Sequence, residues 1–354
     1  MRTRLILLPI ALGAAFVLGR YSFHRDAAQP VATKTSIVAK SALPADPDRG
    51  SLLQRLGILQ PDTTDAQDDA GDTDAIDPVA SYEDLMYAQP DLIDASLKRL
   101  RPQMPGKIDL YALGFAGDGE ENVFRNEVDY LPKLLAQRFG AEGRTLQLIN
   151  SPQTFDRTPL ATRTNLYEAL SGIAAKMDTD QDILLLFLTS HGSRNHKLYV
   201  AMGSMPLDQL TPEDIRDALD AAHIRWRVIV VSACYSGGFI PALRDPHTMI
   251  ITAARSDRTS FGCGSDSQIT WFGKAFLTEA LNQTTDFHDA YLRARTTIAS
   301  WEKRDKETPS EPQFWAGTLI QKKLDAWRTT LPATTAAAFV PVPTGSASHR
   351  AVMH

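Results

Sequence analysis

Cysteine is scarce in this chain, since only Cys234 and Cys263 occur among its 354 residues. Two cysteines form at most one bridge, so the sequence excludes a small fold that depends on a disulfide framework. An excess of positive charge is also missing, because 37 lysines and arginines stand against 42 aspartates and glutamates, giving a net charge of −5. That balance argues against binding to the phosphates of duplex nucleic acid, and we expect no nucleic-acid partner.

Long hydrophobic runs are missing except at the N-terminus, where Leu5 to Gly19 is apolar and follows Arg2 and Arg4. A short basic region before such a run is typical of a secretory signal. No A-x-A-like cleavage site follows it. Residues 1–26 are therefore predicted to be a signal anchor, or a signal peptide if they are cleaved. This predicts a membrane partner and export of the C-terminal part to a periplasmic or other extracytoplasmic space, or secretion after cleavage.

Residues 27–80 are predicted to form an acidic, disordered linker. Apolar residues are scarce in residues 61–78, which carry seven aspartates and cannot repay ordering entropy by burial. The aspartates of this segment lack the glycine and terminal glutamate spacing of an EF-hand, so a calcium loop is not predicted. Neither a metal site nor a cofactor is expected. Residues 331–354 are predicted to be a disordered tail, which leaves residues 81–330 for one folded domain.

Within this domain, apolar runs alternate with amphipathic stretches. Several runs are apolar throughout, which is typical of strands covered on both faces. The predicted strands are residues 107–115, 145–150, 182–190, 227–233 and 248–254, and the predicted helices are residues 126–140, 162–177, 211–223, 271–283 and 286–304. Residues 310–317 could be an edge strand or the rim of a cleft. The alternation predicts an α/β fold, a three-layer sandwich whose mostly parallel sheet has helices on both faces.

Two of the predicted strands end in residues that can carry chemistry. His191 and Gly192 follow one, and Cys234 follows the other. If these strands pair, their carboxyl ends lie about 5 Å apart, and the imidazole and the thiol share one cleft. A lone buried cysteine is usually structural. An imidazole beside a thiol, however, can take its proton and later protonate a leaving group, so the pair predicts nucleophilic thiol catalysis.

Small residues surround the predicted nucleophile. The backbone N–H groups of Gly192 and Cys234 are predicted to donate to a developing oxyanion. Gly237 and Gly238 are expected to leave open space for a peptide. The nucleophile elbow of an α/β-hydrolase is excluded, because it needs glycine two positions before and after the nucleophile, where this chain has serine.

The motifs TSHG, which contains His191, and SACYSGG, which contains Cys234, resemble the legumain (asparaginyl endopeptidase) family of caspase-like cysteine peptidases. The catalytic subunit of the GPI-anchor transamidase belongs to the same family. Residues 114–135 and 251–281 are similar to further segments of that family, so the resemblance covers about residues 105–300. It implies a caspase-like fold, with His191 as general base and acid, Cys234 as nucleophile and Gly192 as an oxyanion donor.

The resemblance also implies a substrate-binding pocket. Arg125 matches its basic residue, and Asp266 lies near its acidic one. The sequence departs from the family at two positions: Ser232 replaces the glutamate that helps to read a substrate asparagine, and Val123 replaces a supporting asparagine. Asparagine specificity is therefore not implied.

We thus predict a cysteine endopeptidase that cleaves peptide bonds through a thioester acyl-enzyme, with a peptide or protein as substrate. A transamidase or peptide ligase that uses the same dyad is one alternative. A catalytically idle caspase-like scaffold that binds partners is another. Cys263 is expected to be a spare thiol, although in an oxidising space it could form a reversible bridge with Cys234.

Overall fold

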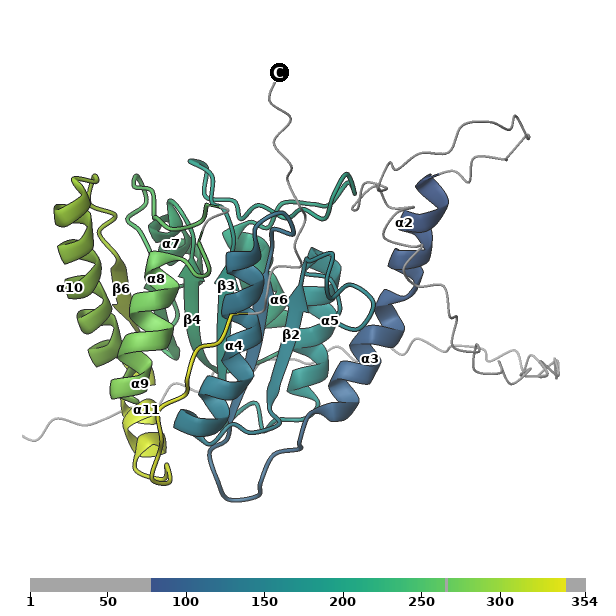
Figure 1. Ribbon diagram of the computed structural model, residues 1–354. Coiled ribbons are helices and arrows are strands. Elements are labelled where there is room, and N and C mark those ends of the chain that lie inside the picture. Colours follow the sequence, from purple (N-terminus) through teal and green to yellow (C-terminus); the bar gives the residue numbers. More distant parts are fainter. Residues whose placement is uncertain (1–77, 265–266, 342–354) are drawn as a thin grey trace, which may run out of the picture. The chain divides into compact units, whose positions relative to one another are not determined.

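The computed structural model describes residues 78–264 and 267–341 (Figure 1). The chain divides into two units, residues 1–47 and 48–354, and every described element belongs to the second. The predicted signal segment and nearly all of the predicted linker lie outside the described residues. Within the described ranges, no helix combines the length and the apolar character that a membrane span needs.

A six-stranded sheet in the order β2-β1-β3-β4-β5-β6 forms the centre of the fold. The first five strands are parallel, and β6 pairs antiparallel with β5 at the edge. Residues 310–317 therefore supply an edge strand. The strands are β1 (Leu110–Ala116), β2 (Thr145–Ile149), β3 (Ile183–Thr189), β4 (Trp226–Ser232), β5 (Thr248–Thr252) and β6 (Gln313–Ala316).

Helices cover both faces of this sheet, as Figure 1 shows, so the predicted three-layer α/β sandwich is confirmed. One face packs against α4 (Asn122–Phe139), α8 (Trp271–Gly273), the π-helical segment η2 (Lys274–Ala280), α9 (Leu281–Gln283), α10 (Phe287–Asp305) and α11 (Ile320–Arg328). The other face packs against α3 (Gln89–Arg99), α5 (Arg163–Ala174), α6 (Pro212–Ala221), the short η1 (Ser236–Phe239) and α7 (Ile240–Leu243). Alternate residues of β1 and β3 enter the two cores, which explains why these strands are almost wholly apolar.

Helix α4 runs through Pro132, where the sequence suggests a kink or a later start. Proline has no N–H, so the carbonyl of Val128 loses its helical donor. The side chain of Gln147, on β2, fills this gap with a hydrogen bond of 3.0 Å from Nε2 to the Val128 oxygen. The helix then ends at Gly140, whose φ of 63° is the left-handed conformation that glycine adopts at little cost.

Helices α6 and α2 (Pro78–Tyr87) are short. Helix α6 begins with a capping box between Thr211 and Asp214. Helix α2 packs through Leu85 against a small separate cluster with Phe155 and Met202.

Residues 331–341 differ from the predicted disordered tail, because they pack along α4. The Tyr130 hydroxyl donates to the Ala337 carbonyl at 2.7 Å, and the Ala337 N–H donates to Asn282 Oδ1 at 2.6 Å. The ring of Phe339 meets that of Tyr130 edge to face, with centroids 5.4 Å apart. The prediction was wrong for this segment because its backbone finds side-chain partners on two helices, which a weakly apolar sequence does not reveal. Residues 342–354 lie outside the described residues.

Candidate active site

The two strands that lead to the candidate nucleophile and base are neighbours in the sheet. Thr189, the last residue of β3, pairs with Ser232, the last residue of β4. His191 and Cys234 each follow two residues later, so both lie at the carboxyl edge of the sheet, where parallel strands present functional groups. The predicted pairing of these strands is confirmed.

Asp118 occupies the equivalent position after the next strand of the sheet, β1. Ala116, the last residue of β1, pairs with Thr189, and Asp118 follows Ala116 by two residues. Asp118 Oδ2 lies 3.5 Å from His191 Nε2, and the Asp118 side chain is only 3 % exposed. A buried carboxylate beside one imidazole nitrogen fixes the ring and stabilises its charged form. The sequence analysis missed Asp118, because the predicted strand ended at residue 115 and only the observed strand ends give the three residues a common offset.

The imidazole of His191 is held from two further sides while remaining accessible. Its side chain is 39 % exposed. The ring of Phe124 meets it edge to face, with centroids 5.2 Å apart, and the exposed Tyr199 ring lies 6.5 Å away. The Tyr199 N–H donates to the His191 carbonyl at 2.9 Å, which anchors the backbone. The imidazole therefore has a fixed position and one open side.

Glycine at position 192 is required by the backbone of the candidate nucleophile, Cys234. A Cβ added to Gly192 would lie 2.0 Å from the Cys234 carbonyl oxygen, closer than any side chain tolerates. Among the described residues, the N–H groups of Gly192 and Cys234 donate to no protein acceptor. The two loops thus approach each other closely and leave two donors available.

The sulfur of Cys234 is engaged by the loop that follows β5. The N–H of Ser260 donates to Sγ at 3.3 Å, and Sγ lies 3.6 Å from the Ser260 hydroxyl and 3.7 Å from its carbonyl oxygen. No hydrogen bond joins Cys234 to His191 among the described residues. The loop that follows β5 therefore holds the sulfur of Cys234 through one residue, Ser260.

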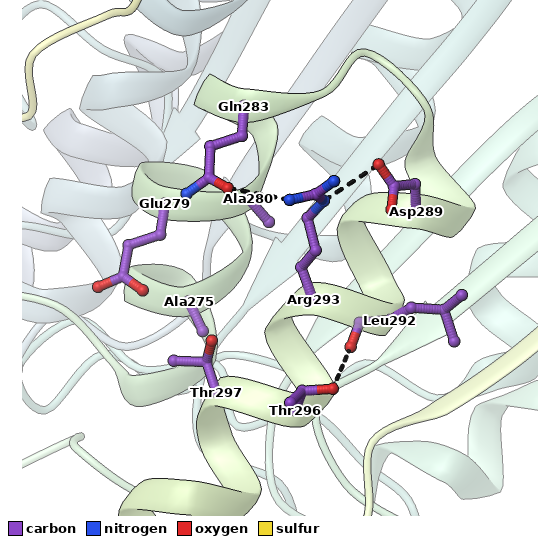
Figure 2. A pocket seen from close by; sticks show the side chains of 9 residues that line it. All are labelled: Ala275, Glu279, Ala280, Gln283, Asp289, Leu292, Arg293, Thr296 and Thr297. Carbon is purple, nitrogen blue, oxygen red and sulfur yellow. Dashed lines mark hydrogen bonds and ion pairs between the residues drawn. The ribbon is translucent and has the colours of Figure 1, made fainter.

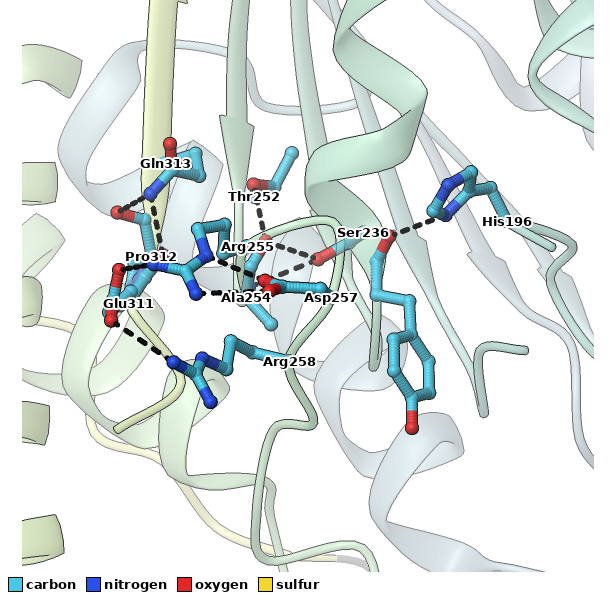
Figure 3. A network of polar contacts seen from close by, with 11 residues as sticks. His196, Ser236, Thr252, Ala254, Arg255, Asp257, Arg258, Glu311, Pro312 and Gln313 are labelled. Atoms are coloured by element: carbon cyan, nitrogen blue, oxygen red, sulfur yellow. Dashed lines mark hydrogen bonds and ion pairs between the residues drawn. The ribbon is translucent and has the colours of Figure 1, made fainter. Parts of the chain in front are cut away.

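The turn after the nucleophile is rigidly anchored (Figure 3). Tyr235 has a φ of 56°, and its N–H donates to the Arg258 carbonyl at 2.7 Å. Ser236 accepts from the Ala254 N–H at 3.1 Å. Beside this turn, Arg255 and Arg258 form ion pairs with Glu311, and Arg255 also pairs with Asp257, as Figure 3 shows. Such a network holds a nucleophile better than an unsupported loop does.

The expected open space beside the nucleophile is filled by protein. A Cβ on Gly238 would lie 2.2 Å from the ring of His196, and His196 Nδ1 lies 3.2 Å from the Tyr235 carbonyl oxygen. A Cβ on Gly237 would lie 2.7 Å from the Ser256 nitrogen. This expectation was wrong: these glycines admit neighbouring chain segments rather than a peptide.

Two of the three predicted substrate-binding residues, Arg125 and Ser232, are buried. Arg125 is 1 % exposed and donates to Gln153 at 2.9 Å. Burial lowers the pKa of its guanidinium, and the carboxylate of Asp129 partly offsets this effect. Ser232 is 3 % exposed, and its hydroxyl lies 3.4 Å from that of Thr270. Asp266 lies outside the described residues.

Both cysteines are free and partly buried. Burial raises the pKa of the Cys263 thiol, and the nearby Cys234 raises it further. The neutral form of Cys263 is favoured, which suits a spare thiol.

The described residues contain no group of three or more His, Cys, Asp or Glu side chains placed to hold a metal ion. A hollow of about 440 Å³ lies between η2, α9 and α10, with Arg293 bonded to Gln283 and Asp289 across it (Figure 2). Neither His191 nor Cys234 lines this hollow.

A parallel sheet covered on both faces, with histidine and cysteine at the carboxyl ends of adjacent strands, is the arrangement of caspase-like cysteine peptidases. Residues 161–323 match the model for the Peptidase C13 family. The match confirms the predicted resemblance to the legumain family and gives this domain a cysteine-peptidase-like function. It contains His191 and Cys234 but begins after β1 and α4, so Asp118 lies outside it. Comparison with curated proteins gave no match.

Proposed function

We propose that the protein is a cysteine endopeptidase that works through a thioester acyl-enzyme. The observation that carries the proposal is the common register of three adjacent strands, in which Asp118, His191 and Cys234 each follow the paired strand end by two residues. This places a carboxylate, an imidazole and a thiol in sequence along one edge of the sheet. That order suits a base that is oriented on one side and acts on a nucleophile on the other.

In the proposed reaction, the Cys234 sulfur attacks the scissile carbonyl carbon, and an S–C bond forms. His191, which holds the proton taken from the thiol, gives it to the leaving amine as the C–N bond breaks. A water molecule then attacks the thioester, His191 takes its proton, and the S–C bond breaks to release the acid. The free N–H groups of Gly192 and Cys234 suit the oxyanion that forms in both steps.

A peptide that carries a thiol-directed electrophile tests this proposal. We expect it to label Cys234, and His191→Ala should slow labelling roughly 10²-fold, the usual contribution of a positioned base. Cys263→Ala is the matched control and should label as the wild type does. Cys234→Ala should lose peptidase activity by several orders of magnitude. Labelling at the rate of free cysteine, unchanged by His191→Ala, would instead support the idle scaffold.

A transamidase would form the same acyl-enzyme and pass it to an amine. Peptide cleavage in the presence of excess amine, followed by mass measurement of the products, separates the two reactions. An acid at the cut site supports hydrolysis, and an amide of the added amine supports transfer. The pocket roles of Arg125, Ser232 and Asp266 stay predictions, and a positional peptide library tests them together with the natural preference.

We also propose that residues 1–26 anchor the protein and that the peptidase domain is exported. The support is the apolar run from Leu5 to Gly19 after Arg2 and Arg4. A phosphatase reporter that becomes active only after export, fused behind residue 80, should be active. Deletion of residues 1–26 should abolish this signal, and equal signals from both fusions would contradict the proposal.

A further inference from the structure

A buried glutamate lies behind the candidate dyad. Glu127, on α4, has 0 % exposure. Its Oε2 accepts from the Thr189 hydroxyl at 2.6 Å. Its Oε1 accepts from the Thr270 N–H at 3.0 Å and from the Thr270 hydroxyl at 2.5 Å. A Cβ on Gly273 would lie 2.1 Å from Oε1, so the chain leaves room there for this carboxylate.

The partners of Glu127 lie next to the reactive residues. Thr189 ends β3, two residues before His191. Thr270 in turn lies 3.4 Å, hydroxyl to hydroxyl, from Ser232, which ends β4 two residues before the nucleophile. A continuous series of short polar contacts therefore joins the two strand ends that carry the imidazole and the thiol.

Thr270 also fixes the end of the loop that engages the nucleophile. Its hydroxyl accepts from the Gly273 N–H at 2.9 Å and so caps α8. The loop between β5 and α8 contains Ser260, whose N–H donates to the sulfur of Cys234. Glu127 thus holds one end of the segment that contacts the nucleophile, in addition to the end of β3.

A carboxylate in this position is a poor choice for stability alone. Burial raises the pKa of Glu127 to about 7, against the effect of its three donors. Replacing a buried charged group by a well-packed apolar one is often neutral or stabilising. A geometric role explains why a buried carboxylate stands here despite its desolvation cost. Its two oxygens bind Thr189 and Thr270, and so hold the end of β3 at a fixed distance from the end of the loop before α8.

We propose that Glu127 is a positioning residue for the candidate dyad, which holds the carboxyl end of β3 and the end of the β5–α8 loop in the arrangement that catalysis needs. The proposal rests on the proposed function, because the geometry it fixes is that of His191 and Cys234. Glu127 itself is too deeply buried to touch a substrate. Its effect reaches the reaction only through the residues that it holds.

The test compares hydroxyl and carboxylate variants in the full-length protein. Thr189→Val removes the donor at nearly constant volume, Thr189→Ser keeps it, and Glu127→Gln replaces one acceptor by a donor. Asp182→Asn is the matched control, since Asp182 is a fully buried carboxylate with backbone donors at the opposite end of β3. We expect Thr189→Val and Glu127→Gln to lower kcat about tenfold, with KM within about twofold, whereas Thr189→Ser and Asp182→Asn keep kcat within about twofold of the wild type.

A second measurement needs no known peptide substrate. In a Cys263→Ala background, the rate at which iodoacetamide alkylates Cys234 reports the reactive thiolate directly. Thr189→Val should slow it and Thr189→Ser should not. The inference is overturned if Thr189→Val and Glu127→Gln keep both rates, or if Asp182→Asn lowers them equally. If alkylation is insensitive to His191→Ala, the proposed function itself fails, which is a distinguishable result.

Discussion

Asp118 is the residue whose contact most directly affects the candidate base. Its carboxylate lies 3.5 Å from His191 Nε2 and is almost fully buried. We expect Asp118→Asn to lower kcat roughly 10²-fold, because the amide keeps the shape but stabilises the imidazolium less. Steady-state kinetics on a cleaved peptide measure this. Glu120→Gln is the control, since Glu120 is an exposed acid two residues away. Equal activity of Asp118→Asn and the control would rule out the contact as part of the site.

Glu127 also predicts a pH dependence of stability. Its pKa rises from 4.5 to about 7 on burial, so the folded state keeps a proton that the unfolded chain loses between these values. Raising the pH through this window therefore lowers the free energy of unfolding, and the loss is complete above the folded pKa.

Chemical denaturation of the wild type and of Glu127→Gln measures this effect. Relative to the variant, the wild type should lose up to roughly 3 kcal/mol between about pH 5 and about pH 8. Glutamine does not titrate, so the difference between the two proteins isolates the carboxyl group. A difference that stays constant with pH would contradict a raised pKa of the buried carboxyl group as the cause.

Asp118 and Glu127 differ in how far the sequence could have revealed them. Asp118 lies three residues after the predicted strand 107–115, whereas His191 and Cys234 come directly after theirs. A search a few residues beyond each predicted strand would therefore have found it. Glu127 lies within a helix, where an acidic residue is ordinarily a solvated surface group. Only the packing of α4 on the sheet shows that its carboxylate points inward.

At the scale of elements, Gln147 compensates for the helical hydrogen bond that Pro132 removes from α4. Proline removes a helical donor, and a side chain from β2 supplies it to the Val128 carbonyl at 3.0 Å. Gln147→Leu should cost about 1 kcal/mol of unfolding free energy, the usual value of one hydrogen bond. In a Pro132→Ala background the cost should fall, because the restored N–H serves the same carbonyl. A double-mutant cycle by chemical denaturation measures the coupling, and additive losses would contradict it.

Loops show the limits of glycine as a signal. A side chain does not fit at Gly192 or at Gly238. What approaches each glycine is decided elsewhere in the chain, by the Cys234 carbonyl in one case and by His196 in the other. The expectation of open space for a peptide beside Gly238 was therefore wrong.

At the scale of the whole molecule, strand order is the feature that creates the site. The order β2-β1-β3-β4-β5-β6 inserts β1 between β2 and β3, which sets the Asp118 loop beside the His191 loop. The family match covers residues 161–323 and thus the strands of His191 and Cys234, but not β1 or α4. The part of the site that supports the imidazole comes from outside the matched range.

The sequence by itself determined most of the strands, the mostly parallel α/β class and the candidate pair of histidine and cysteine, because apolar periodicity and residue chemistry are local properties that survive in any single chain. Tertiary structure alone decided which residues stand behind that pair: a carboxylate beside the imidazole, a buried glutamate beneath both strand ends, a serine N–H on the sulfur and a C-terminal segment packed on α4. Each of these contacts joins residues far apart in the chain, and the free energy that selects them comes from burying many side chains together rather than from any short motif.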